Sequence, residues 1–118
     1  MKYALLIYSD QAEWVDYSDD DKARLRAEEM PRWISLFEEL QKADSSVTGY
    51  ELDEGATARV VRVRDGERLV TDGPFAETKE IAGGVFVTEL PDLDEAIRLA
   101  ALIPSARSGS IEIRPVVG

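Results

Sequence analysis

The chain begins with a short stretch in which apolar residues occupy both alternating faces. Between Lys2 and Tyr8, Leu5 and Ile7 lie on one side of an extended chain, and Leu6 lies on the other. A strand that is covered on both faces, or that lies centrally in a sheet, has this pattern. We therefore expect a first strand in one of these two positions.

Residues 18–43 carry the signals of a long amphipathic helix. Ser18 with Asp21 three residues later is a capping-box variant, and the acidic residues between them suit a helix N-terminus. Apolar residues then recur at spacings of three and four, which is the spacing of one helical face. We assign that face to Ala23, Ala27, Met30, Trp33, Ile34, Phe37 and Leu40. Pro31 predicts a kink or the start of a second helical segment.

Two β-rich runs, residues 59–64 and 68–71, flank an Asp-Gly pair at 65–66. A type I′ turn needs a positive φ at both central residues, so this pair is a strong hairpin signal. In the first arm of the hairpin we expect Val61 and Val63 to face inward and the arginines between them to face outward.

Further strands are expected at residues 47–52, 83–90 and 110–114. Between the last two, Asp92 with Glu95 marks the start of a second helix, which Pro104 ends. We assign the buried face of this helix to Ile97, Ala100 and Ala101.

The predicted order is strand–helix–strand, then a hairpin, then strand–helix–strand. This order predicts an α+β fold of the ferredoxin-like kind, with an inserted β-hairpin and two main helices on one face of an antiparallel sheet. The chain has no repeat, no low-complexity run and no linker, so we expect one domain over residues 1–118.

The composition excludes several classes of function. The 118 residues carry a net charge of −10, and such an acidic surface repels phosphate backbones and anionic membranes. The sequence contains no cysteine and no histidine. This removes disulfides, thiolate nucleophiles, Cys/His zinc sites and a Ser-His-Asp triad. We expect no nucleic-acid partner and no membrane partner.

Motifs for cofactors, metals and targeting are also missing from the sequence. No Gly-rich phosphate loop follows a strand, and the carboxylates show no EF-hand spacing. The first apolar run lacks a basic start and is too short for a signal peptide, and no stretch reaches the length of a membrane span. We therefore expect a cytoplasmic protein without a cofactor or a metal.

The segment Asp72–Glu80 has the distinctive sequence DGPFAETKE. Further matching segments follow in the expected order and cover essentially the whole chain. They are MKY at 1–3, LLIY at 5–8, VRDG at 63–66, PDLDEA at 91–96 and GSIEIRP at 109–115. On these motifs the chain resembles the YCII-related superfamily, specifically its DGPF-domain branch.

The resemblance implies a dimeric ferredoxin-like α+β barrel from a mostly bacterial, mostly uncharacterised group. Some relatives act on small acids derived from aromatic rings, with catalysis assigned to a His-Asp pair. That mechanism cannot be carried over, because this chain has no histidine. Genes of the DGPF type often lie beside those of extracytoplasmic-function sigma factors, which suggests an accessory or regulatory role.

Asp72 is the first candidate for chemistry, since it follows a strand and precedes Gly73 and Pro74. In a cleft it could act as a general base, with the Gly-Pro pair fixing the loop and admitting a ligand. The alternative is that Asp72 caps the turn and that Gly73 and Pro74 are architectural. Phe75 either forms an apolar wall of a pocket or anchors the loop.

Four further residues are candidates for the same site. Lys79 could hold an anionic group or act as a base, or it could form a solvated ion pair with a neighbouring glutamate. Tyr8 and Asp10 end the first strand, where strand ends form pocket rims, although Tyr8 could equally be a core aromatic. Arg114 could recognise a carboxylate or pair across strands.

Together these features predict a homodimer, because a small sheet leaves an apolar face that a second protomer can bury. Trp14 could cover a cleft or a dimer contact. We expect a small polar or anionic metabolite to bind near the Asp72 loop. Any catalysis would be cofactor-free acid–base chemistry by Asp72, with Lys79 and Tyr8 in support. The alternative is a non-catalytic module that senses a ligand or contacts a partner in a sigma-factor pathway.

Overall fold

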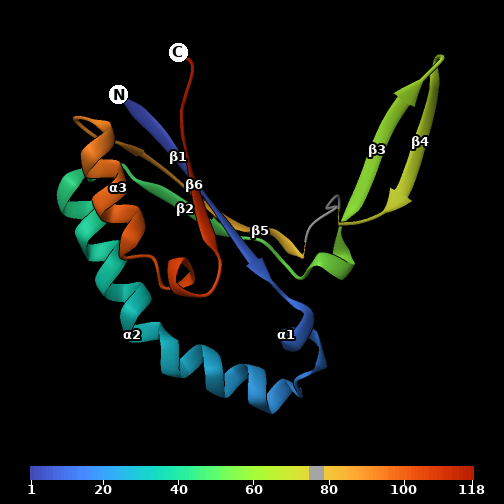
Figure 1. Ribbon diagram of the computed structural model, residues 1–118, viewed down its shortest axis with the longest axis horizontal. Helices are drawn as coiled ribbons and strands as arrows, with labels where there is room; N and C mark the ends of the chain where they lie inside the picture. Colours follow the sequence, from blue (N-terminus) through green and yellow to red (C-terminus); the bar gives the residue numbers. More distant parts are fainter. Residues whose placement is uncertain (75–78) are drawn as a thin grey trace.

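The computed structural model describes residues 1–74 and 79–118, and Figure 1 shows how its elements are arranged. The strands are β1 (Lys2–Asp10), β2 (Thr48–Glu51), β3 (Arg59–Arg64), β4 (Glu67–Asp72), β5 (Glu80–Glu89) and β6 (Ser110–Pro115). The helices are α1 (Ala12–Asp16), α2 (Asp19–Ala43) and α3 (Leu93–Ala101), with short 3₁₀ turns at η1 (Gly55–Thr57) and η2 (Pro104–Arg107).

Four strands form the main sheet in the order β2-β5-β1-β6, and each neighbouring pair is antiparallel. With α2 between β1 and β2, and α3 between β5 and β6, this is the expected ferredoxin-like α+β arrangement. β1 lies centrally, which explains its continuous apolar sequence. Both main helices lie on one face of the sheet (Figure 1). The predicted fold class is confirmed.

The hydrophobic core lies between that face and the two main helices. Alternate residues of β1 point toward the helices, and Tyr3, Leu5 and Ile7 are buried there. They pack with Leu36 and Leu40 from α2, so Tyr3 contributes an aromatic ring to the core. The residues between them point to the opposite, open face of the sheet.

The core face of α2 differs in part from its prediction. The helix continues through Pro31 as one element, although its two halves run in different directions in Figure 1. Met30 and Ile34 were expected in the core but are 49% and 53% exposed, whereas Leu36 is buried. Met30 lies on the part of the helix that extends beyond the strands, because the helix has 25 residues. Ile34 is exposed for another reason, since the helical face that meets the core is formed by Trp33, Leu36, Phe37 and Leu40.

α3 begins where the sequence predicts, since the Asp92 carboxylate accepts a hydrogen bond from the Glu95 N–H at 2.9 Å. Its buried residues are Ala96, Leu99 and Ala100. Ile97 is exposed, which corrects the predicted face by one position around the helix.

The hairpin forms as expected, with positive φ at Asp65 and Gly66 in the turn. The prediction that Val61 and Val63 face inward is wrong, because these side chains are 59% and 62% exposed. The reason is that β3 and β4 make a separate two-stranded sheet that projects away from the main sheet (Figure 1). In β3 the half-buried residues are instead Val60 and Arg62, on the other face of the hairpin.

Asp44 connects the C-terminal end of α2 to the C-terminal end of β5. One carboxylate oxygen accepts a hydrogen bond from the Glu89 N–H at 2.8 Å and a longer one from the Thr88 hydroxyl. The other oxygen accepts from the N–H and the hydroxyl of Ser46. These donors favour the ionised form and lower the pKa of Asp44 from 3.8 to about 2.

We predict that Asp44→Asn makes the domain less resistant to acid. A lowered pKa contributes stability that is complete above the ordinary value and is lost as the pH falls from about 4 toward about 2. The wild type should therefore show an acid-unfolding transition by circular dichroism that moves to higher pH in the variant. Asp16→Asn on α1 is the matched control, and an equal shift in both variants would contradict the prediction.

Candidate functional site

A cavity of about 670 Å³ lies between the N-terminal half of α2 and the ends of β1 and β5. Apolar, aromatic, polar and charged side chains all contribute to its lining. The apolar part of the lining is Ile7, Trp14, Met30, Trp33, Phe37, Tyr50, Leu52 and Phe86. The charged and polar part is Ser9, Asp10, Gln11, Arg26, Glu29, Glu51, Glu54, Ser105 and Ser108.

Three aromatic rings form the inner wall of the cavity. The Phe86 ring lies 6.5 Å from the Trp33 ring and 6.4 Å from the Phe37 ring, both in tilted arrangements. Gly49 on β2 makes room for Phe86, because a Cβ at that position would overlap with the ring. The aromatic wall therefore depends on a glycine in the neighbouring strand.

A β-bulge opens the sheet at the cavity floor. Ile7 pairs with Gly84 but Tyr8 pairs with Ala82, so Gly83 is an extra residue in β5. Gly83 and Gly84 both line the cavity without a side chain. A Cβ added at Gly83 would come no closer than 3.7 Å to its neighbours, so this glycine leaves usable space.

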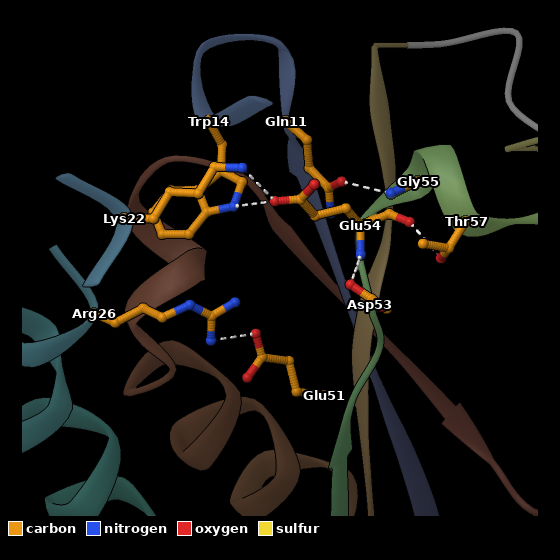
Figure 2. Close-up of polar contacts among 9 residues, drawn as sticks. All are labelled: Gln11, Trp14, Lys22, Arg26, Glu51, Asp53, Glu54, Gly55 and Thr57. Atoms are coloured by element: carbon orange, nitrogen blue, oxygen red, sulfur yellow. Dashed lines mark hydrogen bonds and ion pairs between the residues drawn. The ribbon is translucent and has the colours of Figure 1, made fainter. Parts of the chain in front are cut away.

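Glu54 connects α1 and the start of α2 to the segment that follows β2, at the rim of the cavity (Figure 2). Its carboxylate accepts hydrogen bonds from the Lys22 ammonium at 2.7 Å and from the Trp14 indole N–H at 3.1 Å. Next to it, the Gln11 side-chain oxygen accepts from the Gly55 N–H at 3.0 Å. We call these five residues the Glu54 cluster.

The partners of Glu54 also set its protonation. The Lys22 ammonium, followed by the Trp14 N–H, stabilises the carboxylate and lowers the pKa of Glu54 below its ordinary value. The cluster joins α1, the start of α2 and the segment before η1, which are distant in sequence. It therefore holds the rim in place at neutral pH.

A second ion pair crosses the cavity opening. Arg26 on α2 contacts Glu51 on β2 at 2.8 Å, and its guanidinium lies 5.3 Å from the centre of the Trp14 ring. Figure 2 shows this pair beside the Glu54 cluster. Among the described residues, the lining contains the carboxylates of Asp10, Glu29, Glu51 and Glu54 and the guanidinium of Arg26.

The structure separates the residues that the sequence grouped into one site. Asp10 lines the cavity, and its carboxylate accepts a hydrogen bond from the Ala12 N–H. Tyr8 is half-buried on the opposite face of the sheet, where it pairs with Ala82 and Ser110. Asp72 lies at the root of the hairpin, 90% exposed, and pairs with Arg59 at 3.5 Å.

The remaining predicted residues also lie away from the cavity lining. The Gly73 N–H donates to the Ala58 carbonyl at 2.9 Å, and Pro74 packs beside Gly55. Lys79 is exposed just before β5, and Arg114 is exposed on β6, in register with Ala4. The prediction for Phe75 falls outside the described residues.

The described ranges 1–74 and 79–118 contain neither a cluster of metal-binding side chains nor a membrane-spanning helix. In these ranges, three or more acidic side chains do not come together in a way that could hold a metal ion. Within the same ranges, no helix is both long and apolar enough to cross a membrane.

Comparison with known proteins places the chain in a family. The model of the YCII-related domain matches residues 1–118. The chain belongs to the YCII-related family. A curated relative, an uncharacterized protein of Rhizobium meliloti (strain 1021), is 31% identical over 118 residues, which cover 98% of this chain and 92% of the relative. The family predicted from the motifs is confirmed, and its DGPF branch stays a prediction.

Sequence reasoning missed most of the cavity in this YCII-related domain. Glu54 and Lys22 are 32 residues apart, and no local pattern pairs them. Phe86 was assigned only to a strand, although its ring forms the cavity wall. Two signals were usable: Asp10, predicted from its place at a strand end, and Trp14, a large aromatic residue that was expected to cover a cleft or a dimer contact.

We predict that Glu54→Gln loosens the rim of the YCII-related domain. The neutral amide keeps the size of the side chain but loses the ionic attraction to Lys22, so residues 11–26 and 52–58 should exchange amide hydrogen faster. Hydrogen–deuterium exchange by mass spectrometry measures this directly. Wild type should show the same loosening only at a pH below the ordinary glutamate range, because the pKa of Glu54 is lowered. Glu13→Gln on α1 is the control, and unchanged exchange in Glu54→Gln would refute the role.

Proposed function

We propose that this domain binds a small organic molecule with an apolar, preferably aromatic, body in the cavity beneath α2. The observation that carries the proposal is the inner wall of three aromatic rings behind a polar opening. Apolar walls with a few placed polar groups are the usual construction of small-molecule sites. A flat ring would fit against Trp33, Phe37 and Phe86.

The size of the cavity supports a ligand of metabolite or drug dimensions. Its volume of about 670 Å³ lies inside the range of roughly 300–1,000 Å³ that is typical of ligand pockets. Ser9 and Gln11, which lie beside Gly83, and Ser108 supply hydroxyl and amide groups that can donate and accept hydrogen bonds. The ligand would therefore place its ring against the aromatic wall and its polar end toward these groups.

The charge of the lining favours a neutral or cationic polar end. Four carboxylates line the described part of the cavity, and two of them are already paired, Glu51 with Arg26 at 2.8 Å and Glu54 with Lys22 at 2.7 Å. An anionic ligand would have to displace Glu51 from Arg26 and would meet the carboxylates of Asp10 and Glu29. Within the polar or anionic class expected from the sequence, the polar alternative is the better supported.

Acid–base catalysis by Asp72 and Lys79 is a separate proposal that needs a second binding place. Asp72 is 90% exposed at the hairpin root, and neither residue belongs to the cavity lining. A general base must come within hydrogen-bond reach of the proton that it removes. Catalysis of this kind therefore requires a ligand at the Gly73–Pro74 loop, not in the cavity.

We predict that Gly83→Val weakens ligand binding by filling the cavity floor. Small aromatic alcohols, amides, amines and acids would be screened by thermal shift on the wild type. A ligand at 100 times its dissociation constant stabilises by about 2.7 kcal/mol, which raises the melting temperature of a domain of this size by several degrees. Affinities of the hits for the variant, measured by calorimetry, should fall by about ten-fold or more, a loss of ~1.4 kcal/mol.

Two matched variants distinguish the outcomes. Ala82→Val adds two of the three carbons that Gly83→Val adds, but to the neighbouring residue of β5 on the opposite face, and should leave the affinity unchanged. Asp72→Asn tests the loop. A hit that is lost in Asp72→Asn but retained in Gly83→Val would reject the cavity and place binding at the loop. Failure of every compound class on a folded wild type would reject a small-molecule function of this kind.

A further inference from the structure

One end of the cavity already holds a cationic group, which the chain itself supplies. Arg26 lies four and seven residues before Met30 and Trp33 on α2, so the three share a helical face, and all three line the cavity. The Arg26 guanidinium contacts the Glu51 carboxylate at 2.8 Å and lies 5.3 Å from the centre of the Trp14 ring, within cation–π range (Figure 2). We call the Glu51 carboxylate and the Trp14 ring the cation subsite.

The cation subsite lies a short distance from the aromatic wall. On β2, Gly49 lies beside the Phe86 ring, and Glu51 follows two residues later, about 7 Å further along the same face of the strand. On α2, Arg26 precedes Trp33 by seven residues, about 10 Å along the helix axis. A molecule with one aromatic ring and a short charged group therefore has the length to reach from the wall to the subsite.

Arg26 is held only weakly in the cation subsite. Its side chain is 52% exposed and that of Glu51 is 64% exposed, and ion pairs between exposed side chains contribute little to stability. Glu29 follows Arg26 by three residues on the same helix, which is a spacing at which the two side chains can pair. Glu29 lines the cavity and forms no ion pair within residues 1–74 and 79–118. Arg26 thus has a second carboxylate to contact when it leaves Glu51.

We propose that the ligand of the cavity is an aromatic cation, an amidine, guanidine or amine, whose charged group displaces Arg26 from the cation subsite. This inference rests on the proposed function, because it assigns the polar end of the same ligand. A planar amidinium or guanidinium reproduces the paired N–H groups that an arginine offers to a carboxylate. Arg26 occupies the subsite of the empty cavity and competes with the ligand for it.

Three probes of nearly equal size test the charge of the ligand. Benzamidine is positive at neutral pH, benzamide is neutral and benzoate is negative. Titrations of the wild type, followed through the indole N–H signals of Trp14 and Trp33 by NMR, should show that benzamidine binds about ten-fold more tightly than benzamide. Benzoate should bind most weakly. Equal affinity for benzamidine and benzamide would overturn this inference and leave the proposed function standing.

Substitutions in the Arg26–Glu51 pair test the displacement. Glu51→Gln should weaken benzamidine about ten-fold and leave benzamide unchanged, because only the ionic contact is lost. Arg26→Gln should bind benzamidine several-fold more tightly than the wild type, because the competitor is removed. In the double variant Arg26→Gln should no longer improve binding, because the two side chains act on one contact.

The matched controls are Arg24→Gln and Glu28→Gln, which change an exposed ion pair of the same helix outside the described cavity lining. Equal effects in these controls would show that overall charge alone matters, which overturns the proposal. Weaker binding of benzamidine to Arg26→Gln would also overturn it, because Arg26 would then hold the ligand.

Two further results would contradict the displacement. Loss of benzamidine in Asp10→Asn but not in Glu51→Gln would place the cation at the end of β1 and overturn the assignment to the subsite. A wild type that binds neutral compounds of the wider screen but not benzamidine would overturn this inference alone. Absence of binding by every probe and every screened compound would overturn the proposed function as well. Circular dichroism checks that each variant is folded.

Discussion

The contact between the C-terminal half of α2 and the helix-facing side of β1 determines the rest of this structure. Leu36 and Leu40 bury themselves against Leu5 and Ile7, which aligns the helix with the sheet. The helix is about 37 Å long and the strand about 30 Å, so the helix cannot be covered along its whole length. Its N-terminal half overhangs, the cavity is the space beneath, and the Glu54 cluster anchors the free end.

The order of the elements was predictable because each carries a local signal. Ser18 and Asp92 accept the hydrogen bonds that begin their helices, and Asp65–Gly66 has the positive φ values of its turn. The facing of the elements was less predictable, since alternation shows that two sides differ but not which layer each side meets. Two residues illustrate this. Val61 follows the expected alternation but faces solvent, and Met30 lies on the predicted helical face, in the part of α2 that extends beyond the sheet.

The candidate site lay beyond sequence reasoning because its parts meet only through the fold. Asp10 was found from its place at a strand end, which is a local property, and it lines the cavity. The pairing of Lys22 with Glu54 joins segments 32 residues apart, and the Phe86 ring reaches the cavity because Gly49 lies beside it. The conspicuous motif at Asp72 drew attention to the hairpin root, where the structure places an exposed ion pair.

The bulge at Gly83 separates the pairing of β5 from the shape of the cavity floor. Because Gly83 is an extra residue, Ile81 pairs with Ser9 and fills the space beside Gly55. A ladder without Gly83 would still place Ala82 opposite Tyr8 and Ile81 opposite Ser9, with every side chain on its present face. Gly83 is therefore dispensable for the register of the strand, and both a substitution and a deletion there would act on the space at the cavity floor.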